Sequence, residues 1–284
     1  MTNKLQLARP LDSLTSDIVR KIQQAAATLD HRPLLVGATA RIILLEHVFA
    51  LPTGRATKDI DFAFAMDTWE QFDTLKRHLV EQHGFGIDEH VSQRLYYREE
   101  GARHGIPVDL VPFGALGGQA EEIRWPPDMA IVMNVAGFAD ALASAVHVEI
   151  APGLDIAIAS LPAIAVLKLF AWLDRHQETS KDATDLTALM RVYHEVDQDR
   201  VYTVPSEVLA DVGYDIELGG AWLLGNDARR MALPATVDKL DAVLADTART
   251  ERLANDMARK LPVPDPDAHA AHLLTQFKKG FGTT

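Results

Sequence analysis

Two aspartates stand one residue apart inside an apolar segment of the sequence. Asp59 and Asp61 belong to KDIDFAF, where Ile60 and Phe62 alternate with them. A β-strand turns successive side chains to opposite faces, so the two carboxylates share one face. Like charges at this spacing repel each other, and partial burial strengthens the repulsion. The pattern fits a cation held between the carboxylates or a surface strand that carries two acids, and the apolar neighbours favour the cation.

A third acid, Asp109, lies in another apolar segment, PVDLV. A lone acid in a strand is often an edge residue or a salt-bridge partner. Neighbouring strands lie about 4.8 Å apart, so Asp109 would complete a three-carboxylate cluster if its strand were next to the strand of Asp59 and Asp61. Oxygen ligands without His or Cys suit Mg²⁺ or Mn²⁺. Two such ions about 3.5–4 Å apart are typical of sites for in-line phosphoryl transfer.

A turn of the type that binds phosphate precedes the acids. The segment GATAR begins at Gly37, where an apolar strand ends and a helix is expected to begin. Backbone N–H groups and the hydroxyl of Thr39 suit a phosphate there, with Arg41 as a further nucleotide ligand. A tight strand-to-helix turn would explain the glycine equally well. Arg55 and Thr57, just before the acidic strand, are candidates for contacts with the nucleotide or for shaping the loop.

A stripe of positive charge and one aromatic ring marks a later helix. Lys168, Trp172 and Arg175 fall at positions i, i+4 and i+7 and therefore share one helical face. Two cations beside an indole could bind a triphosphate and stack a base. The alternative is that Lys168 extends its ammonium group from an otherwise apolar helix into water.

The elements that must position these residues change character along the chain. The first part of the chain mixes helices and strands. Asp67 and Glu70 predict a capping box at the start of one of these helices. Helices are expected at 14–29, 38–51 and from 67 to about 81, and strands at 33–37, 59–65, 93–99, 108–111, 146–150 and 156–159.

From residue 161 onward the pattern is helical. Helices are expected at 161–176, 181–196, 205–225, 235–260 and 266–279. The sequence therefore predicts an α+β protein: a mixed sheet with flanking helices in a catalytic domain, residues 1–160, and a helical domain, residues 161–284, that completes the nucleotide and acceptor cleft.

Composition limits the classes of function. The chain of 284 residues carries a net charge of −12, so a nucleic acid would need a local basic patch or bridging metal ions. It has no cysteine, which excludes disulfides and thiolate chemistry and fits a reducing cytoplasm. The first residues lack the apolar core of a signal peptide, and no apolar run reaches about 18 residues. A soluble cytoplasmic protein is expected.

Glycine turn, helix, acidic strand and later strand aspartate, in this order, resemble the DNA polymerase β-type nucleotidyltransferase superfamily. The segments GATAR, RATKDIDF, QRLYY, VDLVPFG, WPPD, ASLPAIAVLKLFAWLDR and KDATDL are similar to the AbiEii toxin nucleotidyltransferases, also called the MenT family. The resemblance covers about residues 33–190. The superfamily usually has Gly-Gly or Gly-Ser in the turn, where this chain has Gly37-Ala38.

The resemblance implies metal-dependent transfer of a nucleoside monophosphate (NMP) from a nucleoside triphosphate (NTP), with Mg²⁺ or Mn²⁺ as cofactor. It implies tRNA 3′ ends as acceptors and a co-expressed antitoxin as partner. Gly37 and Thr39 match the glycine-turn motif, and Asp59, Asp61 and Asp109 match the metal ligands. Lys168 matches a lysine near the nucleotide phosphates, and Lys181, Asp182 and Asp185 match a late lysine–acid motif.

Four alternatives to these assignments follow from the residues themselves. Lys181 and Asp185 at positions i and i+4 could be an exposed pair, worth only about 0.3–0.5 kcal/mol. A metal-dependent glycosyltransferase also uses an Asp-x-Asp motif, although the glycine turn and Asp109 disfavour it. The acceptor could be a protein or a small molecule. A binding module that has lost activity is disfavoured because all three carboxylates are present.

Overall fold

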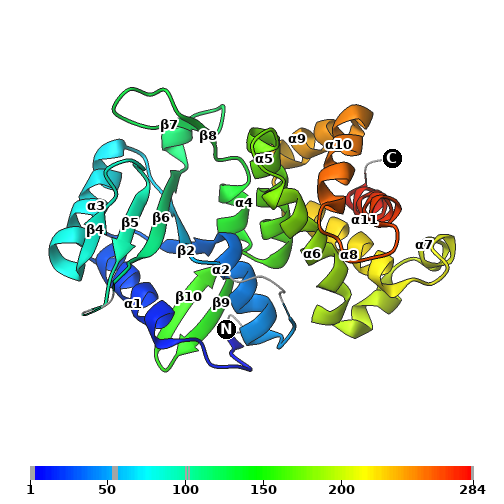
Figure 1. Cartoon of the computed structure of the whole chain (residues 1–284), viewed down its shortest axis with the longest axis horizontal. Coiled ribbons are helices and arrows are strands. Elements are labelled where there is room, and N and C mark those ends of the chain that lie inside the picture. The colour runs from blue at the N-terminus through cyan, green and yellow to red at the C-terminus, as the bar shows by residue number, and fades with distance from the viewer. Residues whose placement is uncertain (1–3, 53–56, 100, 102, 283–284) are drawn as a thin grey trace. The chain divides into compact units, whose positions relative to one another are not determined.

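A computed structural model describes residues 4–52, 57–99, 101 and 103–282 of the chain. The chain divides into two compact units, Met1–Ser160 and Leu161–Thr284 (Figure 1). The first combines strands with helices, and the second is built from helices. The predicted α+β class, with a mixed sheet and a helical C-terminal region, is confirmed.

The first unit is organised around a mixed eight-stranded sheet. Its strand order is β1-β9-β10-β2-β3-β6-β5-β4, with parallel pairing between β1 and β9, β10 and β2, and β3 and β6. The strands are β1 Leu5–Gln6, β2 Pro33–Val36, β3 Ile60–Ala65, β4 Phe85–Ile87, β5 Arg94–Tyr97, β6 Ile106–Phe113, β9 Val146–Ala151 and β10 Leu154–Ile158. β3 therefore lies inside the sheet, between β2 and β6.

The interior position of β3 follows from its side chains. Phe62, Ala63 and Phe64 are fully buried, so both faces of the strand are covered. Helices α1 (Ser13–Thr28) and α3 (Trp69–His83) pack against each other beside this sheet (Figure 1). An inner strand holds its side chains more rigidly than an edge strand, which suits a site that depends on their orientation.

The start of α3 differs from the prediction by one residue. Thr68 is the N-cap and forms a capping box with Gln71, whereas Asp67 with Glu70 was the predicted pair. Both pairs have cap-type residues three positions apart. Phe72, Leu75 and Leu79 are buried and form the apolar face of the helix.

The helix after the glycine turn is composite. The sequence predicts one helix over 38–51, and the structure has α2 (Gly37–Ile42) followed by a π-helical segment, η1 (Ile43–Val48). Several short elements had no clear signal in the sequence. They are β1, β4, the 3₁₀ turn η2 Ala115–Gly117, α4 Phe138–Ala143 and the hairpin of β7 Glu122–Arg124 with β8 Val132–Asn134.

The second unit consists of helices around an apolar core. Its elements are α5 Leu161–Arg175, α6 Lys181–Val196, the 3₁₀ segment η3 Gln198–Thr203, α7 Ser206–Asp211, α8 Ile216–Met231, α9 Pro234–Ala245, α10 Thr247–Ala258 and α11 Pro266–Phe281. Helix α5 packs on α6 and α8, and α8 packs on α11. Among the helices that the structure describes, none combines the length and apolar character needed to cross a lipid bilayer.

Candidate functional site

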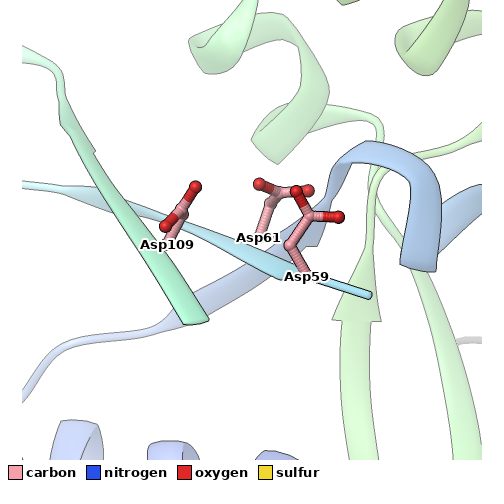
Figure 2. Close-up of side chains that lie close together, drawn as sticks. All are labelled: Asp59, Asp61 and Asp109. Atoms are coloured by element: carbon pink, nitrogen blue, oxygen red, sulfur yellow. The ribbon is translucent and has the colours of Figure 1, made fainter. Parts of the chain in front are cut away.

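Three carboxylates converge where β3 and β6 run side by side. The parallel register places Asp61 directly opposite Asp109, and Asp59 immediately precedes β3. One carboxylate oxygen from each residue lies within 4.8 Å of the others. Figure 2 shows the three side chains on the same side of the two strands. The predicted neighbourhood of the two acidic strands is therefore confirmed, and a half-buried three-carboxylate cluster results.

Gly37 closes one side of this cluster. Its backbone adopts a positive φ of 71°, which L side chains rarely adopt, and a Cβ there would lie 2.8 Å from Cγ of Asp61. The approach follows from the pairing of β2 with β3, which places Val36 opposite Asp61. The positive φ and the close approach both fall on Gly37, so the turn accommodates an alanine at its second position, Ala38.

Two threonines act on Asp59. The hydroxyl of Thr39 donates to the backbone carbonyl of Asp59 at 2.9 Å, and the hydroxyl of Thr57 donates to Oδ1 of Asp59. A hydroxyl has one hydrogen to donate, so in this arrangement neither threonine offers a hydrogen to a phosphate. Thr39 was predicted to contact the nucleotide, and Thr57 to contact it or to shape the loop; both threonines support Asp59 in this structure.

Of the two predicted arginine ligands, the structure describes Arg41. Arg41 is only 2% exposed, so its guanidinium group does not face open solvent. The sequence did not predict that Arg41 on α2 would be buried. It was proposed as a nucleotide ligand because it is a positive charge close to the glycine turn. Arg55 lies outside the described residues.

Arg94 contacts the cluster although it was not among the predicted site residues. Its Nε donates to Oδ1 of Asp109 at 2.7 Å, and its Nη2 donates to Oδ2 at 2.8 Å. The antiparallel pairing of β5 with β6 places the two residues opposite each other. These bonds hold the pKa of Arg94 above its usual value, so the group stays charged. The available signal was an arginine in QRLYY at the start of a predicted strand.

The predicted lysine and acid residues form an ion-pair network within the helical unit. The ammonium group of Lys168 on α5 donates to Asp182 at 2.9 Å and to Asp185 at 2.7 Å, both on α6. Asp182 is fully buried and also accepts two bonds from Arg175. An ammonium group has three hydrogens, so two carboxylates leave Lys168 at most one for a phosphate.

The ion pairs of this network keep Lys168 and Asp182 in their charged forms. Burial works to lower the pKa of Lys168, but attraction by Asp185 and Asp182 outweighs burial, and the pKa is raised. Burial likewise works to raise the pKa of Asp182, but Arg175 and Lys168 outweigh it, and the pKa is lowered. Lys181 opens α6, and its backbone N–H donates to Oγ1 of Thr179.

Trp172 is buried within the helical unit and hydrogen-bonded there. The indole is 1% exposed, and its Nε1–H donates to Asp256 at 3.0 Å. Its ring also lies 4.9 Å from the ring of His176. The indole that was predicted to stack a base is therefore buried inside the helical unit.

The carboxylate cluster fits a divalent cation. Three oxygen donors within 4.8 Å are the ligand type that Mg²⁺ and Mn²⁺ prefer, and such a cation would offset their mutual repulsion. The absent side chain at position 37 leaves room for the Asp61 carboxylate itself. Residues that satisfy these requirements and lie next to a strand-to-helix turn can support phosphoryl transfer.

Comparisons with solved structures find weak similarities. ANT(2'')-Ia in complex with adenylyl-2''-tobramycin is 16% identical over 67% of this chain and 94% of that chain, with a TM-score of 0.40. The solution structure of the antibiotic-resistance factor ANT(2'')-Ia is 16% identical over 72% and 98%, with a TM-score of 0.38. JHP933 from Helicobacter pylori is 15% identical over 95% and 93%, with a TM-score of 0.36.

No curated protein matches the sequence. The assignment of the chain rests on a family match instead. Residues 22–280 match the family described as "Nucleotidyl transferase AbiEii toxin, Type IV TA system". This match confirms the resemblance and extends it well beyond residues 33–190. The chain therefore belongs to the AbiEii nucleotidyltransferase toxin family.

Proposed function

We propose that this protein transfers an NMP from an NTP to an acceptor hydroxyl group, that the reaction needs Mg²⁺ or Mn²⁺, and that the acceptor is the 3′ end of a tRNA. The observation that carries the proposal is the meeting of Asp59, Asp61 and Asp109 at the β3–β6 pair. Membership of a nucleotidyltransferase family supports the reaction class and disfavours the glycosyltransferase alternative.

In this reaction the acceptor oxygen forms a bond to the α-phosphorus of the NTP. The bond from that phosphorus to the bridging oxygen breaks, pyrophosphate leaves with the bonding electrons, and the hydroxyl proton passes to water. When bound, the divalent cations supply charge neutralisation of the phosphates and lower the pKa of the attacking hydroxyl. Most of the rate in such reactions comes from positioning and electrostatics.

The residues of this chain would divide the work as follows. Asp59 and Asp61 would hold the cations, and Asp109 would assist the one that activates the acceptor hydroxyl. Thr57 and Thr39 fix Asp59 through the hydrogen bonds described above.

The second group of proposed site residues lies in the helical unit. Lys168 contributes one hydrogen-bond donor and a positive charge toward the triphosphate. Asp182 and Asp185 orient Lys168. Lys181 contacts the nucleotide.

A labelling experiment tests the proposal. Each of the four α-³²P-labelled NTPs is incubated with the protein, total RNA and Mg²⁺, and the products are resolved by size and by ribonuclease sensitivity. The expected result is label in RNA of tRNA size, lost with EDTA and in Asp61→Asn. Asp67→Asn removes an exposed acid just beyond β3 and should label as wild type does. Equal labelling by Asp61→Asn contradicts the proposed site.

The acceptor group is tested separately. Periodate oxidises the vicinal hydroxyls of an RNA 3′ terminus, so pretreated tRNA should accept no label. Persistent labelling of pretreated tRNA, or label that protease removes and ribonuclease does not, contradicts the tRNA 3′ end as acceptor.

The family description, "Type IV TA system", supports a second part of the proposal. We infer that the chain acts as the toxin of a toxin–antitoxin pair in the cytoplasm, where NTPs and tRNA are found. Induced expression should then arrest growth, and Asp61→Asn should not. Arrest should be relieved by co-expression of the protein encoded beside it, and arrest by both variants contradicts this part.

A further inference from the structure

The third carboxylate of the cluster is engaged on both of its oxygens by one arginine. Nε of Arg94 lies 2.7 Å from Oδ1 of Asp109, and Nη2 lies 2.8 Å from Oδ2. The side chain of Asp109 is 14% exposed and that of Arg94 is 27% exposed, so water screens the pair only partly. Two parallel bonds from a planar fork fix the plane of the carboxylate, which one bond to a lysine would not do.

The pairing has two consequences for the cluster. A carboxylate offers about four lone-pair positions, and Arg94 uses one on each oxygen. The remaining positions are free to coordinate, but their direction is set by the arginine. The guanidinium group also places one positive charge at the edge of the three carboxylates. A positive charge this close repels any divalent cation that binds to the cluster.

The origin of the contact is the sheet itself. Arg94 and Asp109 are register partners on β5 and β6, and Asp109 is in turn the register partner of Asp61. The three residues therefore form a row across neighbouring strands. Because the pairing is set by backbone hydrogen bonds, Arg94 is held near Asp109 whether or not the cluster binds a cation.

We propose that Arg94 is a positioning residue for the transfer reaction: it fixes the orientation of the Asp109 carboxylate and weakens the affinity of the cluster for divalent cations. This inference rests on the proposed function. The same arginine that fixes the carboxylate of Asp109 therefore lowers the affinity of the cluster for divalent cations. Cation binding then depends more strongly on the negative charge of the incoming triphosphate.

Two measurements on the same variants test this inference. Mn²⁺ affinity is measured by electron paramagnetic resonance of free Mn²⁺ without nucleotide, and NMP transfer is measured at saturating Mn²⁺. Arg94→Gln should bind Mn²⁺ roughly tenfold more tightly because a neighbouring positive charge is removed. The same variant should transfer NMP roughly tenfold more slowly, because Asp109 loses its fixed orientation.

Two further variants separate charge from geometry. Arg94→Lys keeps the charge and loses the fork, so Mn²⁺ affinity should stay near that of wild type while transfer slows. Arg98→Gln removes the same charge from an exposed position just beyond β5 and should change neither quantity. Loss of folding would weaken Mn²⁺ binding and transfer together, so tighter binding with slower transfer distinguishes positioning from a merely structural role.

The inference is overturned if Arg94→Gln binds Mn²⁺ with unchanged or weaker affinity, or if its transfer rate equals that of wild type. Failure of the proposed function looks different. In that case the wild-type protein itself neither binds Mn²⁺ nor transfers label, and the inference falls with it.

Discussion

Gly37 lies directly against the carboxylate of Asp61, and no side chain fits between them. A Cβ at position 37 would stand 2.8 Å from Cγ of Asp61, well inside van der Waals contact. Gly37 directly follows Val36, which is the register partner of Asp61 in the neighbouring strand, so the pairing of β2 with β3 holds the two residues together. The turn that precedes α2 is thereby part of the carboxylate cluster.

Gly37→Ala should abolish NMP transfer and weaken Mn²⁺ binding, because the new methyl group displaces the Asp61 carboxylate. Backbone strain at positive φ should cost about 1–2 kcal/mol of stability in addition. Gly153→Ala is the matched control, since Gly153 has a φ of 72° with open space around it. It should show the strain in a denaturant titration and transfer NMP at the wild-type rate. Equal activity of both variants would show that the contact with Asp61 is unimportant.

Lys168→Met should lower the free energy of unfolding by about 3–5 kcal/mol, because Asp182 and Asp185 would remain buried without their shared cation. Lys279→Met is the control in the same unit. Lys279 is 42% exposed and lies 3.6 Å from Asp211, so its removal should change stability by less than about 1 kcal/mol. Urea denaturation followed by circular dichroism measures both. A Lys168→Met protein as stable as Lys279→Met would indicate that the buried network contributes no net stability.

The ion-pair network should also set the pH range of stability. The pKa of Lys168 is raised above 10.5 in the folded protein, so its contribution is complete below pH 10.5 and is lost as pH rises through the folded pKa. The pKa of Asp182 is lowered below 3.8, so its contribution is present above pH 3.8 and is lost as pH falls through the folded pKa. Urea midpoints recorded from pH 3 to 11 should fall at both ends. In Lys168→Met the alkaline decrease should be smaller than in wild type, and an unchanged decrease would assign it to other groups.

Trp172→Phe should leave the KM for NTP unchanged and lower stability by about 1–3 kcal/mol. The reason is that Asp256 would lose the buried indole N–H that donates to it. Steady-state kinetics and a denaturant titration measure the two effects. A several-fold rise in KM without loss of stability would support base stacking by the indole after all.

The acidic strands could be predicted from sequence because two simple regularities apply. Alternation places Asp59 and Asp61 on one face, and the apolar residues around Asp109 mark a second buried strand. That the two strands are adjacent and parallel, with Asp61 opposite Asp109, is a property of the sheet order. Sheet order depends on contacts between distant segments, and no local pattern encodes it.

Arg94 and Trp172 show the limits of local patterns. Arg94 reaches Asp109 only through the register of β5 with β6, which no spacing within QRLYY reveals. Helical periodicity correctly placed Trp172 and Lys168 on one face, but it did not show that this face is turned inward. A positive charge in an apolar helix is equally compatible with a phosphate ligand and with a buried partner for two acids.

The central claim is that Asp59, Asp61 and Asp109 together hold the divalent cations of a nucleotidyltransferase. The most direct test is a crystal structure with Mn²⁺ and a non-hydrolysable NTP, in which anomalous scattering locates the ions. We predict Mn²⁺ peaks within coordination distance of oxygens of Asp59 and Asp61, with Asp109 at one of them. Mn²⁺ and triphosphate bound elsewhere on the protein, with the three carboxylates uncoordinated, would contradict the claim.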